Sequence, residues 1–190
     1  MSTAGIGRAQ WATRPLCTRY LVVSFGAQPA TLLVGNGFQP LSFHWAMGTL
    51  DDGQAEILGW WQANLSEPCE WSAISNDLTD RGVRRIRVLT DFSGALGSPG
   101  DYETEFGGGF GSHTLSAAQQ RRVAATGAQM RRVQAALSRA VLRHGAFADA
   151  ESAAALVDRE LQRLDRAFWS QPDVAARTLS RARMPLPVAA

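Results

Sequence analysis

The chain has 190 residues, a formal net charge of +2 and 45% hydrophobic residues, among them six tryptophans. This length and apolar content are enough for a folded core, which excludes wholesale disorder. The two cysteines, Cys17 and Cys69, form no C-x-x-C pair, which argues against a zinc ribbon or a disulfide framework, and no apolar run approaches the ~20 residues of a membrane span. We therefore expect a soluble cytoplasmic protein without a membrane partner.

The first part of the chain predicts four strands. The segments 19–25, 30–36, 41–50 and 55–64 are rich in β-branched and aromatic residues. The glycine-rich triplet 35–37 ends the second segment, and the triplet Asp51-Asp52-Gly53 is a strong turn signal. The segments on either side of this turn should form a hairpin.

A helix and a further strand should follow. Ser66 with Pro68 favours a helix start, Trp71, Ile74 and Leu78 form one apolar stripe, and Gly82 ends the helix. The segment 83–91 predicts the last strand, which ends at Asp91. Because a helix connects it to the earlier strands, this strand should lie parallel to one of them.

The remainder of the chain predicts a loop and then helices. Residues 93–114 contain seven glycines and a proline. From Ser116 onward, apolar residues at helical spacing predict helices over 116–144 and from Asp149 to about residue 168. On the first of these helices, four arginines fall within about 40° of one another, opposite the apolar side: Arg121, Arg132, Arg139 and Arg143.

These elements predict an α+β protein with four regions. Residues 1–92 form a mixed α/β sheet domain, 93–115 a glycine-rich linker, 116–170 a helical hairpin and 171–190 a tail. Charge is distributed unevenly, with 7 arginines against 11 acidic residues in 1–115 and 12 against 6 in 116–190. An acidic first part joined to a basic helical part is typical of proteins that separate chemistry from nucleic-acid binding, although a solvated helix surface would give the same pattern.

The order of strands, hairpin, helix and strand ending in aspartate predicts a ribonuclease-H-like mixed sheet. Many enzymes with this fold cut nucleic acids with two Mg²⁺ ions held by clustered carboxylates. One acid lies on the first central strand, one at the end of the parallel neighbouring strand and one on a later helix. Asp91 occupies the second of these places, so we expect it to be a catalytic residue and a metal ligand.

The same segment resembles the core of mutator-type bacterial transposases. The wording "DDGQAEILGWW", followed by a helix and then by "LTDRGVRRIRVLTDFSGAL", is similar to that family over about residues 31–96. The resemblance implies a DDE acidic triad, Mg²⁺ as cofactor, DNA as partner, and an activity in transposition and DNA recombination. It also implies that Asp91 is the second aspartate of the triad.

The triad that the resemblance implies is incomplete. The family's first aspartate stands on the first core strand, typically just before a glycine, whereas this chain has Asn36 before Gly37. An asparagine can ligate a metal but lacks the charge that holds Mg²⁺ tightly. Glu160 is the best-placed third acid, although a surface pair with Arg163 would explain it equally. The expected metal ligands are therefore Asp91, Asn36 and Glu160, in a truncated or catalytically inactive member whose catalytic residues would be Asp91 and Glu160.

Two alternatives stay open. The chain could be a non-catalytic DNA-binding or protein-interaction module that uses the arginines of its first long helix, or a small α+β domain with an accidental resemblance. The homo-oligomeric state is open as well. Weaker site candidates are the turn residues Asp51 and Asp52 and the loop residues Glu103, Glu105 and His113.

Overall fold

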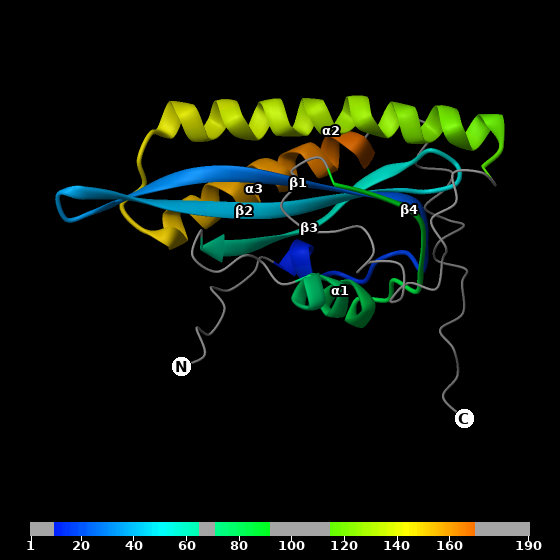
Figure 1. The fold of residues 1–190 in the computed structure, drawn as a ribbon, viewed down its shortest axis with the longest axis horizontal. Coiled ribbons are helices and arrows are strands. Elements are labelled where there is room, and N and C mark those ends of the chain that lie inside the picture. Colours follow the sequence, from blue (N-terminus) through cyan, green and yellow to red (C-terminus); the bar gives the residue numbers. More distant parts are fainter. Residues whose placement is uncertain (1–9, 65–70, 92–114, 170–190) are drawn as a thin grey trace.

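The computed structural model describes residues 10–64, 71–91 and 115–169. Figure 1 shows the order of the elements along the chain. They are a short 3-10 helix η1 (Gln10–Thr13), the strands β1 (Arg19–Val34), β2 (Gly37–Thr49) and β3 (Ala55–Asn64), the helix α1 (Trp71–Asp80), the strand β4 (Arg85–Asp91), and the helices α2 (Ala117–His144) and α3 (Ala150–Trp169).

The four strands form one mixed sheet in the order β3-β2-β1-β4. β1 pairs antiparallel with β2, and β2 pairs antiparallel with β3. β4 pairs parallel with β1, and α1 lies in the connection between β3 and β4. The structure thus confirms the α+β class, the hairpin across Asp51-Asp52-Gly53 and the parallel last strand.

The first two predicted strands are in fact one strand, which corrects the prediction of separate strands at 19–25 and 30–36. β1 pairs with β2 without interruption from Val22↔Thr49 to Val34↔Gly37. Gly26 lies under the indole of Trp45, where an added Cβ would come within 2.7 Å of the ring. The Pro29 carbonyl accepts a hydrogen bond from Gln28 Nε2 at 2.7 Å. Gly26 and Pro29 therefore both lie inside β1, and the turn to β2 is formed by residues 35–36.

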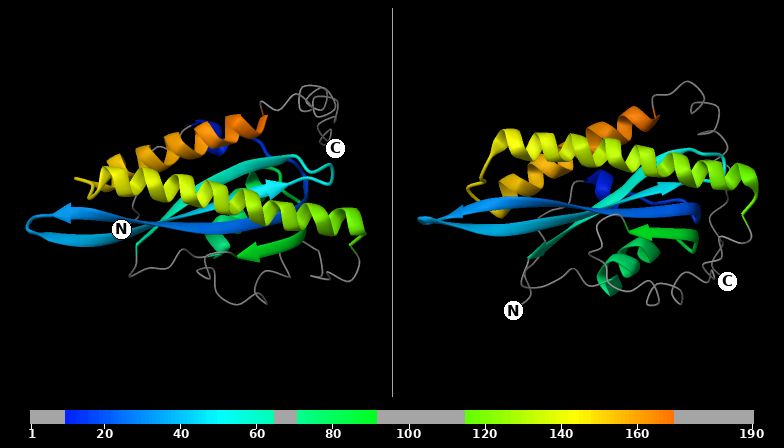
Figure 2. Two further views of the ribbon diagram at one scale, coloured as in Figure 1. Left: turned by 90° about the horizontal axis from the view of Figure 1, so that it is seen from above. Right: turned by 45° about the horizontal axis from the view of Figure 1, so that its top comes forward.

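Two hydrophobic clusters cover the two faces of the sheet. On one face α2 lies along β1 and α3 along β3, and their apolar residues pack on Phe43, Trp45, Ile57 and Trp60. On the other face, Ile74 and Leu78 of α1 pack with aromatic and aliphatic residues of the strands. The result is a sheet between a layer of two helices and a layer of one (Figures 1 and 2).

The ends of α2 and α3 follow from local chemistry. Ser116 forms a capping box with Gln119 at the start of α2, and Gly145 with φ 78° follows its last residue. Asp149 accepts a hydrogen bond from the Ser152 backbone N–H at 2.7 Å, which confirms it as a cap for α3. These bonds to the carboxylate lower the pKa of Asp149 from its usual value.

The turn end of the β1–β2 pair projects beyond the other elements as a two-stranded ribbon (Figure 2). Leu33, Val34 and Phe38 at this end have exposed fractions of 49%, 55% and 73%. No charged residue occurs in 26–43. Phe147, which lies between α2 and α3, is bonded through its backbone to Thr31 and Leu33 and attaches the ribbon to the helical layer.

Several expectations fall outside the described residues. The helix start predicted at Ser66, most of the predicted linker and the predicted tail lie in 65–70, 92–114 and 170–190. Over the ranges that the structure does describe, none of the helices has the length and apolar character needed to cross a membrane.

Candidate functional site

The carboxyl end of β4 lies beside the middle of β1. Asp91 is the last residue of β4 and pairs with Phe25 of β1 in the parallel ladder. The preceding pair, Ser24 and Thr90, shares a hydrogen bond of 2.7 Å between the two hydroxyl oxygens. Residues paired in register point to the same face of the sheet, so Asp91 and Phe25 face the side that α1 covers.

An aromatic cluster occupies this position on β1. Phe25 is fully buried, and its ring centroid lies 6.4 Å from that of Trp61 and 5.4 Å, edge to face, from that of Trp71. Such contacts are typical of a hydrophobic core. Asp91 therefore has a buried phenyl ring where a metal site would need a second carboxylate.

His44 of β2 lies near the same end of β4. Ala46 pairs with Phe25, and His44 lies two residues earlier in β2, on the same face. The side chain is 5% exposed, and its Nδ1 has no hydrogen-bond partner in the part of the chain that the structure describes. Burial lowers the pKa of His44 below 6.5, and the Asp91 carboxylate partly opposes this shift. His44 is a functional candidate that the sequence analysis missed, although the alternation of Phe43, Trp45 and Met47 signals that it faces the other side.

The structure does not bring Asn36 to Asp91. Asn36 lies in the exposed turn between β1 and β2, eleven residues beyond Phe25 along the chain. At about 3.3 Å per strand residue this corresponds to roughly 35 Å. The expected pairing of Asn36 and Asp91 depended on a break in β1 that does not exist.

Glu160 lies on the other side of the sheet. Its carboxylate accepts two hydrogen bonds from Arg163, at 3.0 and 2.9 Å. α3 contacts β3, which is the edge of the sheet opposite β4, on the face that Asp91 does not share. The three expected metal ligands therefore lie in three separate places. Within residues 10–64, 71–91 and 115–169, no group of three or more His, Cys, Asp or Glu residues could hold a metal ion.

The weaker candidates divide into two groups. Asp51 and Asp52 have structural contacts, because Asp51 accepts from Gln119 Nε2 at 3.0 Å and Asp52 accepts from the Gln54 backbone N–H at 2.8 Å. Glu103, Glu105 and His113 lie outside the described residues.

The four arginines of the predicted stripe share one accessible side of α2. Arg121, Arg132, Arg139 and Arg143 are all exposed. Residues of the opposite side of the helix, among them Met130, Val133 and Leu137, are buried against the sheet. We call these four arginines the arginine face.

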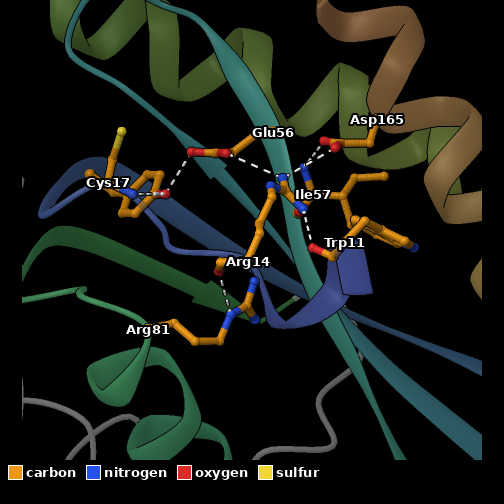
Figure 3. A network of polar contacts seen from close by, with 8 residues as sticks. Trp11, Arg14, Cys17, Glu56, Ile57, Arg81 and Asp165 are labelled. Atoms are coloured by element: carbon orange, nitrogen blue, oxygen red, sulfur yellow. Dashed lines mark hydrogen bonds and ion pairs between the residues drawn. The ribbon is translucent and has the colours of Figure 1, made fainter. Parts of the chain in front are cut away.

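A buried charged network joins η1 to the sheet and to α3 (Figure 3). Arg14 forms ion pairs with Glu56 at 3.3 Å and Asp165 at 3.1 Å, and it donates to the Ile57 carbonyl oxygen at 3.0 Å. Tyr20 donates to Glu56 at 2.6 Å, and burial raises the pKa of its phenol well above 10.0. This network is structural, since each polar group is directed at another part of the same core.

Comparison with known proteins links this architecture to one family. Residues 8–95 match the family model described as Transposase, Mutator family. The match covers η1, the four strands and α1, which is just under half of the chain. The resemblance to mutator-type transposases is therefore confirmed for this part of the chain. A search of curated proteins found no match.

Proposed function

We propose, on the premise that residues 8–95 are a partial mutator-type transposase core, that this chain is a transposase-like DNA-processing protein with an inactive catalytic site. The observation that carries this proposal is the pairing of Asp91 with Phe25. A metal-dependent nuclease of this class needs several carboxylates at one place. In the described chain, Asp91 has an aromatic neighbour instead.

The sheet itself supports the finer proposal of a ribonuclease-H-like, DDE-type scaffold. Three consecutive strands form an antiparallel unit, and a helix then leads to a fourth strand parallel to the first. In this arrangement the end of the fourth strand meets the first strand, which is where such enzymes position two acids. Asp91 is at the end of that fourth strand.

The residues at this position do not fit a Mg²⁺ pair. The family's first aspartate is expected just before a glycine on the first core strand, and the residue before Gly26 is Phe25, opposite Asp91. A phenyl ring has no oxygen to offer to a hard cation, and Mg²⁺ is bound mainly through carboxylates and water. The neighbouring Ser24 hydroxyl is bonded to Thr90. We therefore assign no metal-dependent step to this chain.

A nicking assay on supercoiled plasmid tests the proposal. We expect the wild-type protein and the Asp91→Ala variant to give the same absence of cleavage with Mg²⁺ and with Mn²⁺. Thermal unfolding of both proteins should be equally insensitive to either metal, because a ligand stabilises only a fold that binds it. Metal-dependent nicking by the wild type that Asp91→Ala abolishes would refute the assignment of an inactive site.

A further inference from the structure

The helix α2 has an unusual charge pattern. Over its 28 residues it carries six arginines and no acidic residue. Five of the arginines are exposed, and the sixth, Arg122, packs beside the turn at Gly53. Among the residues that the structure describes, none forms a hydrogen bond or an ion pair with these arginine side chains. The charge of α2 therefore faces solvent without a protein counter-ion in the described chain.

Nearby negative charge lies mainly at the start of α2, where Asp51 accepts from Gln119 at 3.0 Å. Three carboxylates of α3 are held elsewhere: Glu160 pairs with Arg163, Asp165 pairs with Arg14, and Asp158 accepts from Trp60 at 2.8 Å. From Arg131 to Arg143, a ligand that approaches α2 from solvent thus meets arginines with no acidic residue on the same helix.

Side-chain contacts fix α2 on the sheet. Gln134 accepts from Trp45 Nε1 at 3.3 Å and donates to Gln28 at 3.0 Å. About two turns earlier along α2, Thr126 donates to Thr49 at 3.0 Å, and the apolar residues of the same side are buried. Because the sheet buries the apolar side of α2, this side cannot insert into a lipid surface. The helix runs along the outside of the molecule (Figure 1), and the four arginines of the arginine face are exposed on it.

The spacing of the arginine face suits the phosphates of a double helix. At about 1.5 Å per residue, Arg121 and Arg132 are roughly 16 Å apart along the helix axis, Arg132 and Arg139 roughly 10 Å, and Arg139 and Arg143 roughly 6 Å. The grooves of B-DNA are about 12 Å and 6 Å wide, and one turn rises about 34 Å. The arginine face is thus about one turn long, with spacings that allow contacts to both strands.

We propose that the arginine face of α2 binds the phosphate backbone of duplex DNA without reading its sequence. The choice of DNA as the ligand rests on the proposed function, whereas the arginine face is identified from the charge pattern of α2. A duplex is favoured over a single strand because α2 contains no Phe, Tyr or Trp on which unpaired bases could stack. Guanidinium groups suit this role, since they form two parallel hydrogen bonds with a phosphate.

Fluorescence anisotropy with a labelled duplex of roughly 30 base pairs tests the proposal. Four phosphate contacts predict a slope of log K against log salt of about −3.6, so affinity should fall about 150-fold between about 50 and 200 mM salt. The double variant Arg132→Gln/Arg139→Gln should halve the slope and fall only about 12-fold over the same range. The matched control is Arg159→Gln/Arg166→Gln, which removes the same charge from exposed positions of α3 and should keep the wild-type slope.

Three results would overturn the proposal. They are no duplex binding by the wild type at low salt, an equal loss of slope in the α3 control, and equal affinity for a single strand of the same length. Tighter binding to an RNA duplex would assign the surface to a different partner. These outcomes are distinct from failure of the proposed function, because metal-dependent cleavage by the wild type would refute the inactive site and leave the salt slopes unchanged.

Discussion

The guanidinium of Arg14 holds two buried carboxylates at once. The side chains of Glu56 and Asp165 are 3% and 10% exposed, and both lie within 3.3 Å of Arg14 NH2. Removing the cation would take away the positive charge that lies between these two buried acids. The Arg14→Met variant should therefore lose about 3–5 kcal/mol of unfolding free energy in urea denaturation.

The control for this variant is Arg84→Met. Arg84 is exposed and donates a hydrogen bond of 3.3 Å to the Thr79 carbonyl oxygen, so its replacement should change the unfolding free energy by about 0.5 kcal/mol or less. A loss in Arg14→Met no larger than that in the control would show that the network does not hold η1 on the core.

His44 gives a prediction about pH. Its pKa in the folded protein is lowered from 6.5 by burial, so below pH 6.5 the unfolded chain binds more protons than the folded one. The His44 contribution to stability is therefore complete above about pH 6.5 and decreases as the pH falls toward the folded pKa. Between pH 7 and 5, the unfolding free energy of the wild type should fall more steeply than that of His44→Gln, by up to about 1.4 kcal/mol per pH unit. Urea denaturation at several pH values measures this difference, and parallel curves for the two proteins would contradict it.

At the scale of elements, the sequence predicts best what is encoded locally. The turn at Asp51-Asp52-Gly53 and the apolar spacing of α2 and α3 depend on neighbouring residues, and these elements lie close to their expected ranges. The sequence predicts two strands in place of β1 because Gly26 and Pro29 ordinarily interrupt strands. In this sheet, Gly26 makes room for Trp45 and Pro29 stands where β4 has already ended.

The candidate site depends on register, which local patterns do not fix. The sequence context predicts Asp91 at the end of the last strand, and the structure confirms this position. The residue that pairs with Asp91 is determined by the register between β4 and β1. In this register Asp91 pairs with Phe25, and Asn36 lies far away, beyond the end of the long strand β1. A pairing between distant segments of this kind is visible only in the fold.

Gly26 provides a test of how β1 packs. A Cβ at this position would meet three atoms of the Trp45 indole at 2.7–2.9 Å, and this indole is fully buried under α2. The Gly26→Ala variant should therefore lose about 1–3 kcal/mol of stability. Gly37→Ala is the control on the same ribbon, since a Cβ there has only the Val34 carbonyl oxygen within 4 Å, at 3.8 Å. Equal thermal midpoints for the two variants would show that Trp45 can move aside.

At the scale of the whole molecule, the projecting ribbon has a proline on each of its two outer edges, Pro29 in β1 and Pro40 in β2. The Thr31 carbonyl oxygen is bonded to Phe147, so the backbone of Thr31 and of its partner Pro40 points away from the β1–β2 ladder. β3 pairs with β2 only from Leu41 onward, so within the described residues no strand pairs with β2 at Pro40 on that side. On the β1 side, Pro29 lies beyond the end of β4.

We predict that Pro40 limits self-association of the ribbon. Pro40→Thr restores a backbone donor at an apolar, charge-free edge, so it should raise the fraction of oligomers in size-exclusion chromatography with light scattering. Pro15→Thr, an exposed proline outside the strands, is the control and should stay at the wild-type distribution. Identical elution of both variants would show that the edge is protected by other means.

The two prolines also restrict how anything could dock at that end of the protein. Where a proline replaces a backbone donor, an incoming strand loses one hydrogen bond of the ladder, so strand addition is weakened at that point. What remains accessible are the side chains of Leu33, Val34 and Phe38. A stable contact at this end would therefore depend on packing against these three apolar side chains. Such packing favours a partner with a preformed apolar pocket over a flexible peptide.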